Sequence, residues 1–486
     1  MGLTVPTMAA IRYGYGLRAG EDPVAGPDDL MKQVRQGLAE KPRFPREGLT
    51  GRRETIGKIL SVRAAEAKAA QGGKPNPDLR RETQREAQQI YQRDAMARIA
   101  QTVDSPYGFY ERLAAFWAGH FATSAAKSFL MRMVVPLHEV EAIRPNVGGS
   151  FRDLLHAAVL HPAMLIYLDQ NRSVGPESPV GQKTERGLNE NLGRELLELH
   201  TLGADGGYGQ ADVRAAALIL TGLTVDTRTL EVTYRRRLAE PGAIKLLGKT
   251  YGEEGQPEND HLAMLDDLAA NPQTARHICR KLVAHFIADD PPAEVIEPMV
   301  AAWTESDGNL TNVYRAMLDH PRAWTEEGRK VKQPFEFIVS GIRALGVPDK
   351  DFSELLREAE AEEDEEEDGA MAAQADEGEA KRGRSLARTL TIGALRRMGQ
   401  PVWQPPSPAG FPDDTATWVS PSQVSERIAW ARMAAETLGR SAQPADLLRA
   451  ALADAAREDT IRLVEQAPSR AHGLTMVFAS PEFNRR

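Results

Sequence analysis

Apolar residues recur every three or four positions through most of the chain, and this period predicts α-helices. Glycine and proline interrupt the pattern and divide it into separate helical segments. Helices are predicted at residues 79–102, 107–122, 150–168 (interrupted at Pro162), 189–202, 208–223, 258–270, 273–289, 292–305, 309–319, 421–437, 443–453 and 458–466. In the fifth of these, Gly209 is the expected N-cap, and Asp212 falls at the third helical position, where a carboxylate suits the helix dipole.

One region has the two-residue period of a β-strand. Leu230, Val232 and Tyr234 alternate with polar residues, and the tetrapeptide "AEPG" separates residues 230–238 from residues 243–251. This pattern predicts a strand pair, and we expect no other sheet. The predicted fold is mostly α, a single large multi-helical body over residues 1–486 with a minor β-hairpin at 230–251.

The charge of the chain is concentrated in one segment. The net charge is -9, but residues 358–379 hold twelve Asp or Glu and no Lys or Arg, so the remainder carries +3. Like charges repel, and such a segment can bury little apolar surface. We expect residues 358–383 to form a low-complexity, disordered acidic insertion. A solvated insertion fits this composition better than an interaction tail.

Composition excludes several classes of protein. No apolar run approaches the roughly 18 residues that a membrane helix needs, and no basic stripe interleaved with aromatic residues indicates nucleic-acid binding. Cys279 is the one cysteine of the sequence, which excludes an internal disulfide. The first residues lack the features of a signal peptide, so we expect a cytoplasmic protein, unless a leader has been removed from an exported one.

The segment "NENLGRELLELHTLG", residues 189–203, carries an unusual density of polar chemistry. At about 100° per residue, one side of the predicted helix gathers Glu190, Asn191, Arg194, Glu195, Glu198 and Thr201. Leu192, Leu196 and Leu199 lie on the opposite side, and His200 lies at the border. Gly203 is a typical residue to end such a helix.

Two interpretations fit this polar face. It can be a solvated face, on which Arg194 forms i,i+4 pairs with Glu190 and Glu198, each worth about 0.2–0.5 kcal/mol. Alternatively it is buried, in which case Arg194 keeps the carboxylates ionised and the neighbouring glutamates split their pKa values, as acid–base catalysis requires. The face lacks Lys and Gln, which favours the second interpretation, and so do its asparagines, which are poor helix formers.

The histidine spacing does not indicate a metal site. Five histidines fall between residues 120 and 200, but no His-Glu-x-x-His or Glu-x-x-His motif is present. His156 and His161 are five residues apart and so lie on different helix faces. We therefore expect no metal at His120, His156, His161 or His200. We also expect no cofactor, because no phosphate-binding loop is present. No nucleophile elbow for an acyl-transfer serine is present either.

Several segments, in order, resemble the bacterial domain-of-unknown-function 1800 family. They are "AAIRYGYGLRAGE", "FWAGHFATS", "HPAMLIYLDQNRS", "NENLGRELLELHTLGADGGYGQADVRAAALILTGLTV", "RKLVAHFIADDPP", "KQPFEFIVSGIRALG", "MGQPVWQPPSPAGFPDDTATW" and "SPEFNRR". The resemblance covers nearly the whole chain. It implies one large, mostly helical unit but no settled activity, and with it we expect the polar face of residues 189–202 to be buried.

The leading functional hypothesis is an enzyme with hydrolase-like acid–base chemistry on a saccharide or an ester. The candidate catalytic residues are Glu195, Glu198, Arg194, His200 and His120. The family pattern also falls on candidate substrate-binding residues, namely Asn189, Glu190, Asn191, Asp169, Asn171, Trp117 and Tyr208. The alternative is a non-catalytic partner or maturation protein. The resemblance implies a co-encoded partner of the domain-of-unknown-function 1501 family, which is sulfatase-like and often exported.

Overall fold

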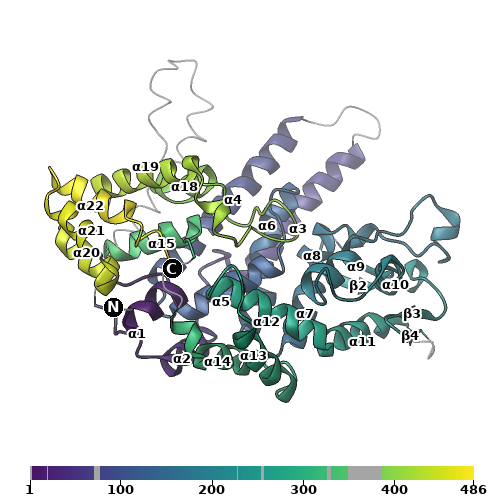
Figure 1. The fold of residues 1–486 in the computed structure, drawn as a ribbon. Helices are drawn as coiled ribbons and strands as arrows, with labels where there is room; N and C mark the ends of the chain where they lie inside the picture. Colours follow the sequence, from purple (N-terminus) through teal and green to yellow (C-terminus); the bar gives the residue numbers. More distant parts are fainter. Residues whose placement is uncertain are drawn as a thin grey trace.

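The computed structural model describes residues 3–18, 20–69, 77–226, 228–252, 257–325, 330–347 and 386–486. The predicted acidic segment 358–383 lies outside these residues. Within them the chain is mostly helical, as the apolar period predicts (Figure 1). No helix in the described ranges has an apolar stretch long enough to cross a bilayer.

The first half of the chain is built from ten α-helices and three π-helical segments in the described ranges. The α-helices are α1 (Val5–Met8), α2 (Pro27–Gly37), α3 (Gly48–Ala69), α4 (Pro77–Asp104), α5 (Gly108–His120), α6 (Phe129–Leu137), α7 (Phe151–Val159), α8 (Pro162–Tyr167), α9 (Asn191–Glu195) and α10 (Gln210–Leu220). The π-helical segments are η1 (Ala9–Tyr13), η3 (His138–Ile143) and η7 (Leu196–His200).

The second half contains two small hairpins and a further series of helices. The strands are β1 (Leu223–Asp226), β2 (Glu231–Tyr234), β3 (Ile244–Leu246) and β4 (Lys249–Tyr251). The α-helices are α11 (Pro257–Ala270), α12 (Pro272–Phe286), α13 (Ala293–Glu305), α14 (Leu310–Asp319), α15 (Pro334–Ala344), α17 (Leu386–Leu390), α18 (Ile392–Arg397), α19 (Pro421–Thr437), α20 (Pro444–Leu452), α21 (Glu458–Glu465) and α22 (Arg470–Ala479).

Most predicted helices are confirmed, with bounds that differ by a few residues. Gly209 is the N-cap of α10, and its N–H donates to Asp212 Oδ2 at 2.9 Å, as expected. The apolar pattern missed α1, α2, α3, α6, α15, α17, α18 and α22. In α15 all eleven residues are buried, including Glu336, Ser340 and Arg343, so its polar side chains do not mark a solvent-exposed face.

The strand pairing differs from the predicted one. The structure has two antiparallel hairpins, β1 with β2 and β3 with β4, in place of one hairpin joined by "AEPG". The turn of the second hairpin is the pair Leu247–Gly248, and both residues have positive φ (49° and 84°). Two such residues form the type I′ turn that suits the twist of a hairpin. The predicted joint instead holds Pro241, which has no N–H for a strand ladder.

One hydrophobic cluster runs through the described chain from Tyr13 to Phe483. At its centre Trp117 of α5 is fully buried, and its indole N–H donates to the hydroxyl of Tyr314 at 2.6 Å. Figure 1 shows α5 and α12 in the middle, α20–α22 at one end, and α9, α10 and the hairpins at the other. The central helices therefore connect both ends of the molecule.

The polar segment 189–202 is not one regular helix. Only Asn191–Glu195 is α-helical, and Leu196–His200 is a π-helix with i→i+5 bonding. This wider turn shifts the side chains from the positions expected at 100° per residue. As a result Arg194 pairs with Glu190 at 3.4 Å, whereas the ion pairs of the structure include none between Arg194 and Glu198.

A buried ion pair joins α5 to the 3-10 turn Arg144–Asn146, which follows η3. The Arg144 guanidinium donates to both Glu111 oxygens at 2.9 and 2.7 Å, and to Glu139 Oε1 at 3.2 Å. Burial raises the pKa of Glu111, but the charge and hydrogen bonds of Arg144 outweigh this effect, and the net shift is downward. Glu111 is therefore buried as a carboxylate, which depends on its partner.

Arg144→Met should lower the free energy of unfolding by about 3–5 kcal/mol, because it leaves the buried charge of Glu111 without its ion-pair partner and removes one donor from Glu139. Urea denaturation followed by circular dichroism measures this loss. The control is Arg152→Met, since the side chains of Arg152 and its partner Asp266 are 58% and 45% exposed. Such a surface pair contributes roughly 0–1 kcal/mol. Equal losses in the two variants would contradict the prediction.

Candidate functional site

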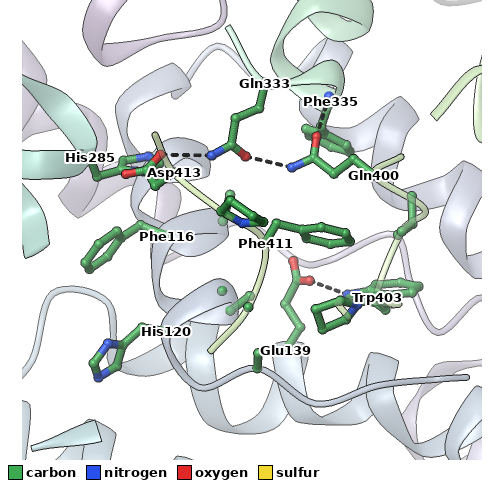
Figure 2. Close-up of a pocket in the computed structure, with 18 of the residues that line it drawn as sticks. Phe116, His120, Glu139, His285, Gln333, Phe335, Gln400, Trp403, Phe411 and Asp413 are labelled. Carbon is green, nitrogen blue, oxygen red and sulfur yellow. Dashed lines mark hydrogen bonds and ion pairs between the residues drawn. The ribbon is translucent and has the colours of Figure 1, made fainter. Parts of the chain in front are cut away.

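A cavity of about 350 Å³ lies between α5, α12, the first turn of α15, η3 and residues 399–413 (Figure 2). This volume lies within the range of about 300–1,000 Å³ that small-molecule sites occupy. The aromatic residues of its wall are Tyr15, Phe116, Phe335, Trp403 and Phe411. The titratable groups with acid, base or cationic chemistry are Arg98, Arg112, His120, His138, Glu139, Lys281, His285, Glu336 and Asp413. Apolar walls with a few convergent polar groups are typical of ligand sites.

The proline-rich segment 399–413 forms one side of the cavity. Figure 2 shows that it brings Gln400, Trp403, Phe411 and Asp413 to the same space. Its prolines limit the backbone to extended conformations. Gly410 has a positive φ of 86°, and a Cβ there would lie 2.5 Å from the carbonyl oxygen of Gly119 at the end of α5. A glycine is therefore required where this segment passes over α5.

His285 occupies the centre of a chain of polar contacts on the cavity wall. Its Nδ1 lies 3.1 Å from Asp413 Oδ2, and its Nε2 lies 3.3 Å from Arg112 Nη2. A guanidinium has only donors, so Nε2 must accept and Nδ1 must carry the proton that goes to Asp413. In this tautomer the Nε2 lone pair of His285 is directed toward Arg112.

Asp413 is held as a carboxylate by several neighbours. Burial raises its pKa, but the interactions with His285, Lys330 and Arg112 outweigh burial and give a net downward shift. Gln333 Nε2 donates to Asp413 Oδ1 at 2.9 Å, and Gln400 Nε2 donates to Gln333 Oε1 at 2.6 Å. These amides fix the orientation of the carboxylate relative to the imidazole.

A second polar group lies at the other side of the cavity, around Glu139 of η3. Arg98 Nε and the indole N–H of Trp403 donate to Glu139 Oε2 at 2.8 and 2.7 Å, and Arg144 donates to Oε1. Figure 2 shows the bond between Glu139 and Trp403. Because its oxygens already accept three donors, Glu139 anchors the segment 399–413 and is a poor candidate for proton transfer.

Helix α12 contributes a stripe of basic side chains at four-residue spacing. His277, Lys281 and His285 follow one another along one face of the helix. Lys281 and His285 line the cavity. Burial lowers the pKa of Lys281 to about 8, and the charge of Asp413 partly opposes this shift. A lysine near neutrality is suited to proton transfer or to binding an anion.

The rings of His120 and His200 each form a hydrogen bond with the backbone carbonyl group of the other residue. His120 Nε2 donates to the carbonyl oxygen of His200 at 3.3 Å, and His200 Nδ1 donates to the carbonyl oxygen of His120 at 3.1 Å. Burial lowers the pKa of His120 well below its usual value and the pKa of His200 to about 3. Both rings are therefore neutral at pH 7. This exchange joins the end of η7 to the end of α5.

Of the residues predicted from the sequence to form the site, His120 alone lines this cavity in the described structure. Trp117 is a core residue bonded to Tyr314. Asn189 lies just before α9, where its Oδ1 accepts the N–H of Asn191 at 2.9 Å. Asp169 pairs with Lys127 at 2.6 Å. Asn171 lies next to the β1 strand, where its carbonyl oxygen accepts from Thr224 Oγ1 at 3.4 Å.

The polar face of residues 189–202 is half-buried and not buried, which corrects the expectation from the resemblance. Glu190, Arg194, Glu195 and Glu198 are intermediate in exposure, and Asn191 is exposed. Leu192, Leu196, Leu197 and His200 take the buried side, so the charged side chains are left at the border with solvent. Within the predicted face the expectation holds for Thr201, which is fully buried.

Glu195 has one property that was predicted for the acid–base pair, namely a pKa shifted by the neighbouring glutamate. Burial raises its pKa, the charge of Glu198 raises it further, and Arg194 opposes both. Tyr208 is half-buried nearby. Burial and the charge of Glu198 raise the pKa of its hydroxyl too. Neither glutamate lines the cavity. Their catalytic role stays a prediction.

The histidines considered as metal ligands have other neighbours. His156 Nε2 lies 2.9 Å from Asp266, and His161 Nε2 lies 3.0 Å from Glu141. In the ranges that the structure describes, no three His, Cys, Asp or Glu side chains gather as a metal site. That no metal binds the whole chain stays a prediction.

The sequence patterns did not indicate His285, Lys281, Arg112 or Asp413 as site residues. A signal was present for the first two, because basic residues at positions 277, 281 and 285 recur at four-residue spacing and so share one helix face. Asp413 had no such signal, since it lies in an irregular proline-rich segment that reaches α12 only through the tertiary fold.

Comparison with known proteins agrees with the resemblance. The family model described as protein of unknown function (DUF1800) matches residues 9–485, nearly the whole chain. The chain therefore belongs to this family. No curated protein and no solved structure matches it.

The neutral histidines predict acid sensitivity. The pKa of His200 is about 3 in the folded state and roughly 6.5 when unfolded. Below pH 6.5 the unfolded chain binds a proton that the folded chain does not. This contribution to stability is complete above pH 6.5 and falls by about 1.4 kcal/mol per pH unit as pH drops below it.

His200→Asn retains a donor near the Nδ1 position but does not titrate. The free energy of unfolding should therefore depend less steeply on pH in this variant than in the wild type between pH 6.5 and 5. Urea denaturation across this window measures both slopes, with His472→Asn as the control on the surface. Parallel slopes for the wild type and His200→Asn would contradict the assignment.

Proposed function

We propose that this member of the DUF1800 family is a hydrolase-like enzyme that cleaves an ester of a small molecule in the cavity. The observation that supports it is the position of His285 between Asp413 and Arg112 on a wall of mixed aromatic and polar character. A histidine oriented by a carboxylate through Nδ1 is a suitable general base. The guanidinium beside it can stabilise a developing negative charge.

The proposed reaction uses water as the nucleophile. His285 Nε2 removes a proton from water, and the hydroxide adds to the ester carbonyl carbon. Arg112 donates to the resulting oxyanion, while Asp413 holds the imidazolium that has formed. The bond from carbon to the alcohol oxygen then breaks, and the proton on Nε2 passes to that oxygen. An acid and an alcohol leave.

The contact between Arg112 and His285 must open for this reaction, because one lone pair cannot accept from both a guanidinium and water. Its length of 3.3 Å is at the long end for a hydrogen bond. Arg112 also pairs with Glu336 through Nη1, so it keeps an anchor when Nη2 turns to substrate. An ester oxygen can then replace Nε2 as its acceptor.

The predicted cluster at 189–202 has a different place in this proposal. Its carboxylates and Arg194 do not line the cavity, so the proposed base is His285 in place of Glu195 or Glu198. His200 supports the cavity wall through its exchange with His120. Hydrolysis of an ester is favoured over that of a saccharide, because the wall carboxylates are engaged by cations.

His285→Asn should lower the rate of ester hydrolysis by about 10²–10⁴-fold, since it retains a donor to Asp413 but lacks the Nε2 base. Initial rates on a series of p-nitrophenyl esters measure this loss, with circular dichroism to establish that the variant folds. His156→Asn, which alters a histidine that pairs with Asp266, is the matched control. A wild-type rate in His285→Asn, or no ester hydrolysis by the wild type, would overturn the proposal.

A second candidate function is that of a non-catalytic partner of the sulfatase-like, domain-of-unknown-function 1501 protein. Val424 and Ile428, one turn apart on α19, are 45% and 41% exposed, and Val419 just before the helix is 47% exposed. An exposed apolar row favours binding to another protein. Co-expressed partner and chain should co-purify, and Val424→Asp with Ile428→Asp should abolish this. Ser422→Asp on the same helix is the control.

A further inference from the structure

Lys281 differs from the other cations of the cavity wall. Arg98 pairs with Glu139 at 2.8 Å, and Arg112 pairs with Glu336. Lys281 has neither a hydrogen bond nor an ion pair to any residue in the described part of the chain, although its side chain is only partly exposed and lines the cavity. A partly buried ammonium without a paired carboxylate is costly, and such groups cluster at functional sites.

Other groups of the wall that could bind an anion are engaged. The N-terminus of α15 borders the cavity, but the N–H of Gln333 donates to Glu336 at 2.9 Å and that of Phe335 to Gln400 at 2.8 Å. His120 donates its one N–H to the backbone of His200. Lys281 is therefore the cation of the described wall whose charge is not paired with a carboxylate.

We infer that the cavity binds a small organic acid with a single carboxylate, which pairs with the ammonium of Lys281 while the apolar body of the acid lies against the aromatic wall. One available ammonium balances one carboxylate. A phosphate monoester carries nearly two charges at neutral pH and would leave one of them uncompensated in a desolvated site. This inference names the ligand class of the proposed function and rests on it for the location of the site.

The aromatic wall supports the apolar part of this ligand. Figure 2 shows Phe116 beside His285 and His120 at one side of the cavity, with Phe411 near its middle. Lys281 precedes His285 by one helical turn on α12. Phe116 is 8% exposed, and it packs against His285 with ring centroids 5.3 Å apart. A bound acid would thus have its carboxylate at Lys281 and its body near the imidazole of His285.

The charge of Lys281 sets a pH limit on binding. Burial lowers the pKa of Lys281 to about 8, so the ammonium is present at pH 7 and is lost as pH rises through about 8. A carboxylic acid is ionised throughout this range. Affinity for the acid should therefore be constant below pH 7 and decrease at higher pH.

Phenylacetate, with one carboxylate and an apolar ring, is a suitable probe for isothermal titration calorimetry. We expect it to bind the wild type at pH 7, and phenylacetamide and phenyl phosphate to bind at least tenfold more weakly. Lys281→Met, which removes the charge but keeps the length of the side chain, should lose at least tenfold in affinity. Lys245→Met changes an exposed lysine of β3 and should bind as the wild type does.

Affinity of the wild type should also fall at least tenfold between pH 7 and pH 9.5, and Lys281→Met should show no such fall. No binding of phenylacetate, equal binding of its amide, or unchanged affinity in Lys281→Met would each overturn the inference. Binding is measured without turnover. Failure of ester hydrolysis therefore remains distinguishable from failure of the acid site.

Discussion

The balance of buried charge around the central cavity is the constraint on which the rest of the structure depends. Glu139, Glu336 and Asp413 lie on its wall, and each is paired with cations from distant parts of the chain. Arg486 lies three residues after Phe483, the last residue of the hydrophobic core, and reaches both Glu336 and Asp413 at 3.1 and 3.2 Å. Since a buried charge without its partner is strongly destabilising, these pairs hold together segments that are distant in the sequence.

The polar groups of the cavity wall divide into those that only support the structure and those that can take part in a reaction. Glu139 accepts from Arg98, Arg144 and Trp403 and has no capacity left, whereas His285 retains an oriented lone pair that only a long contact with Arg112 occupies. Lys281, one helical turn before His285, has no counter-ion in the described structure. The proposed base and the proposed acid-binding group are thus neighbours on α12, in a cavity whose remaining charges are compensated.

Irregular backbone gathers around this cavity. The π-helical segment η3 carries Glu139 and His138, η1 precedes Tyr15, and η7 ends at His200, which bonds to His120. π-helical turns are rare in proteins and occur often at functional sites. In η7 the wider turn also explains why the polar residues near 190–198 lie at a half-buried edge, whereas His200 is buried.

The sequence by itself determined the helical fold, because apolar periodicity records which face of each helix is buried. It also indicated segments that form the cavity. Five of the segments that resemble the family contribute to the cavity wall, including "FWAGHF", "RKLVAHF" and "PAGFPDD". Only the tertiary structure decided where these segments meet. Asp413 and His285 are separated by 128 positions, and no local pattern records that distance. The polar helix attracted attention because its chemistry is contiguous, whereas the cavity is assembled from single side chains on separate elements, whose proximity is set by long-range packing and charge pairing.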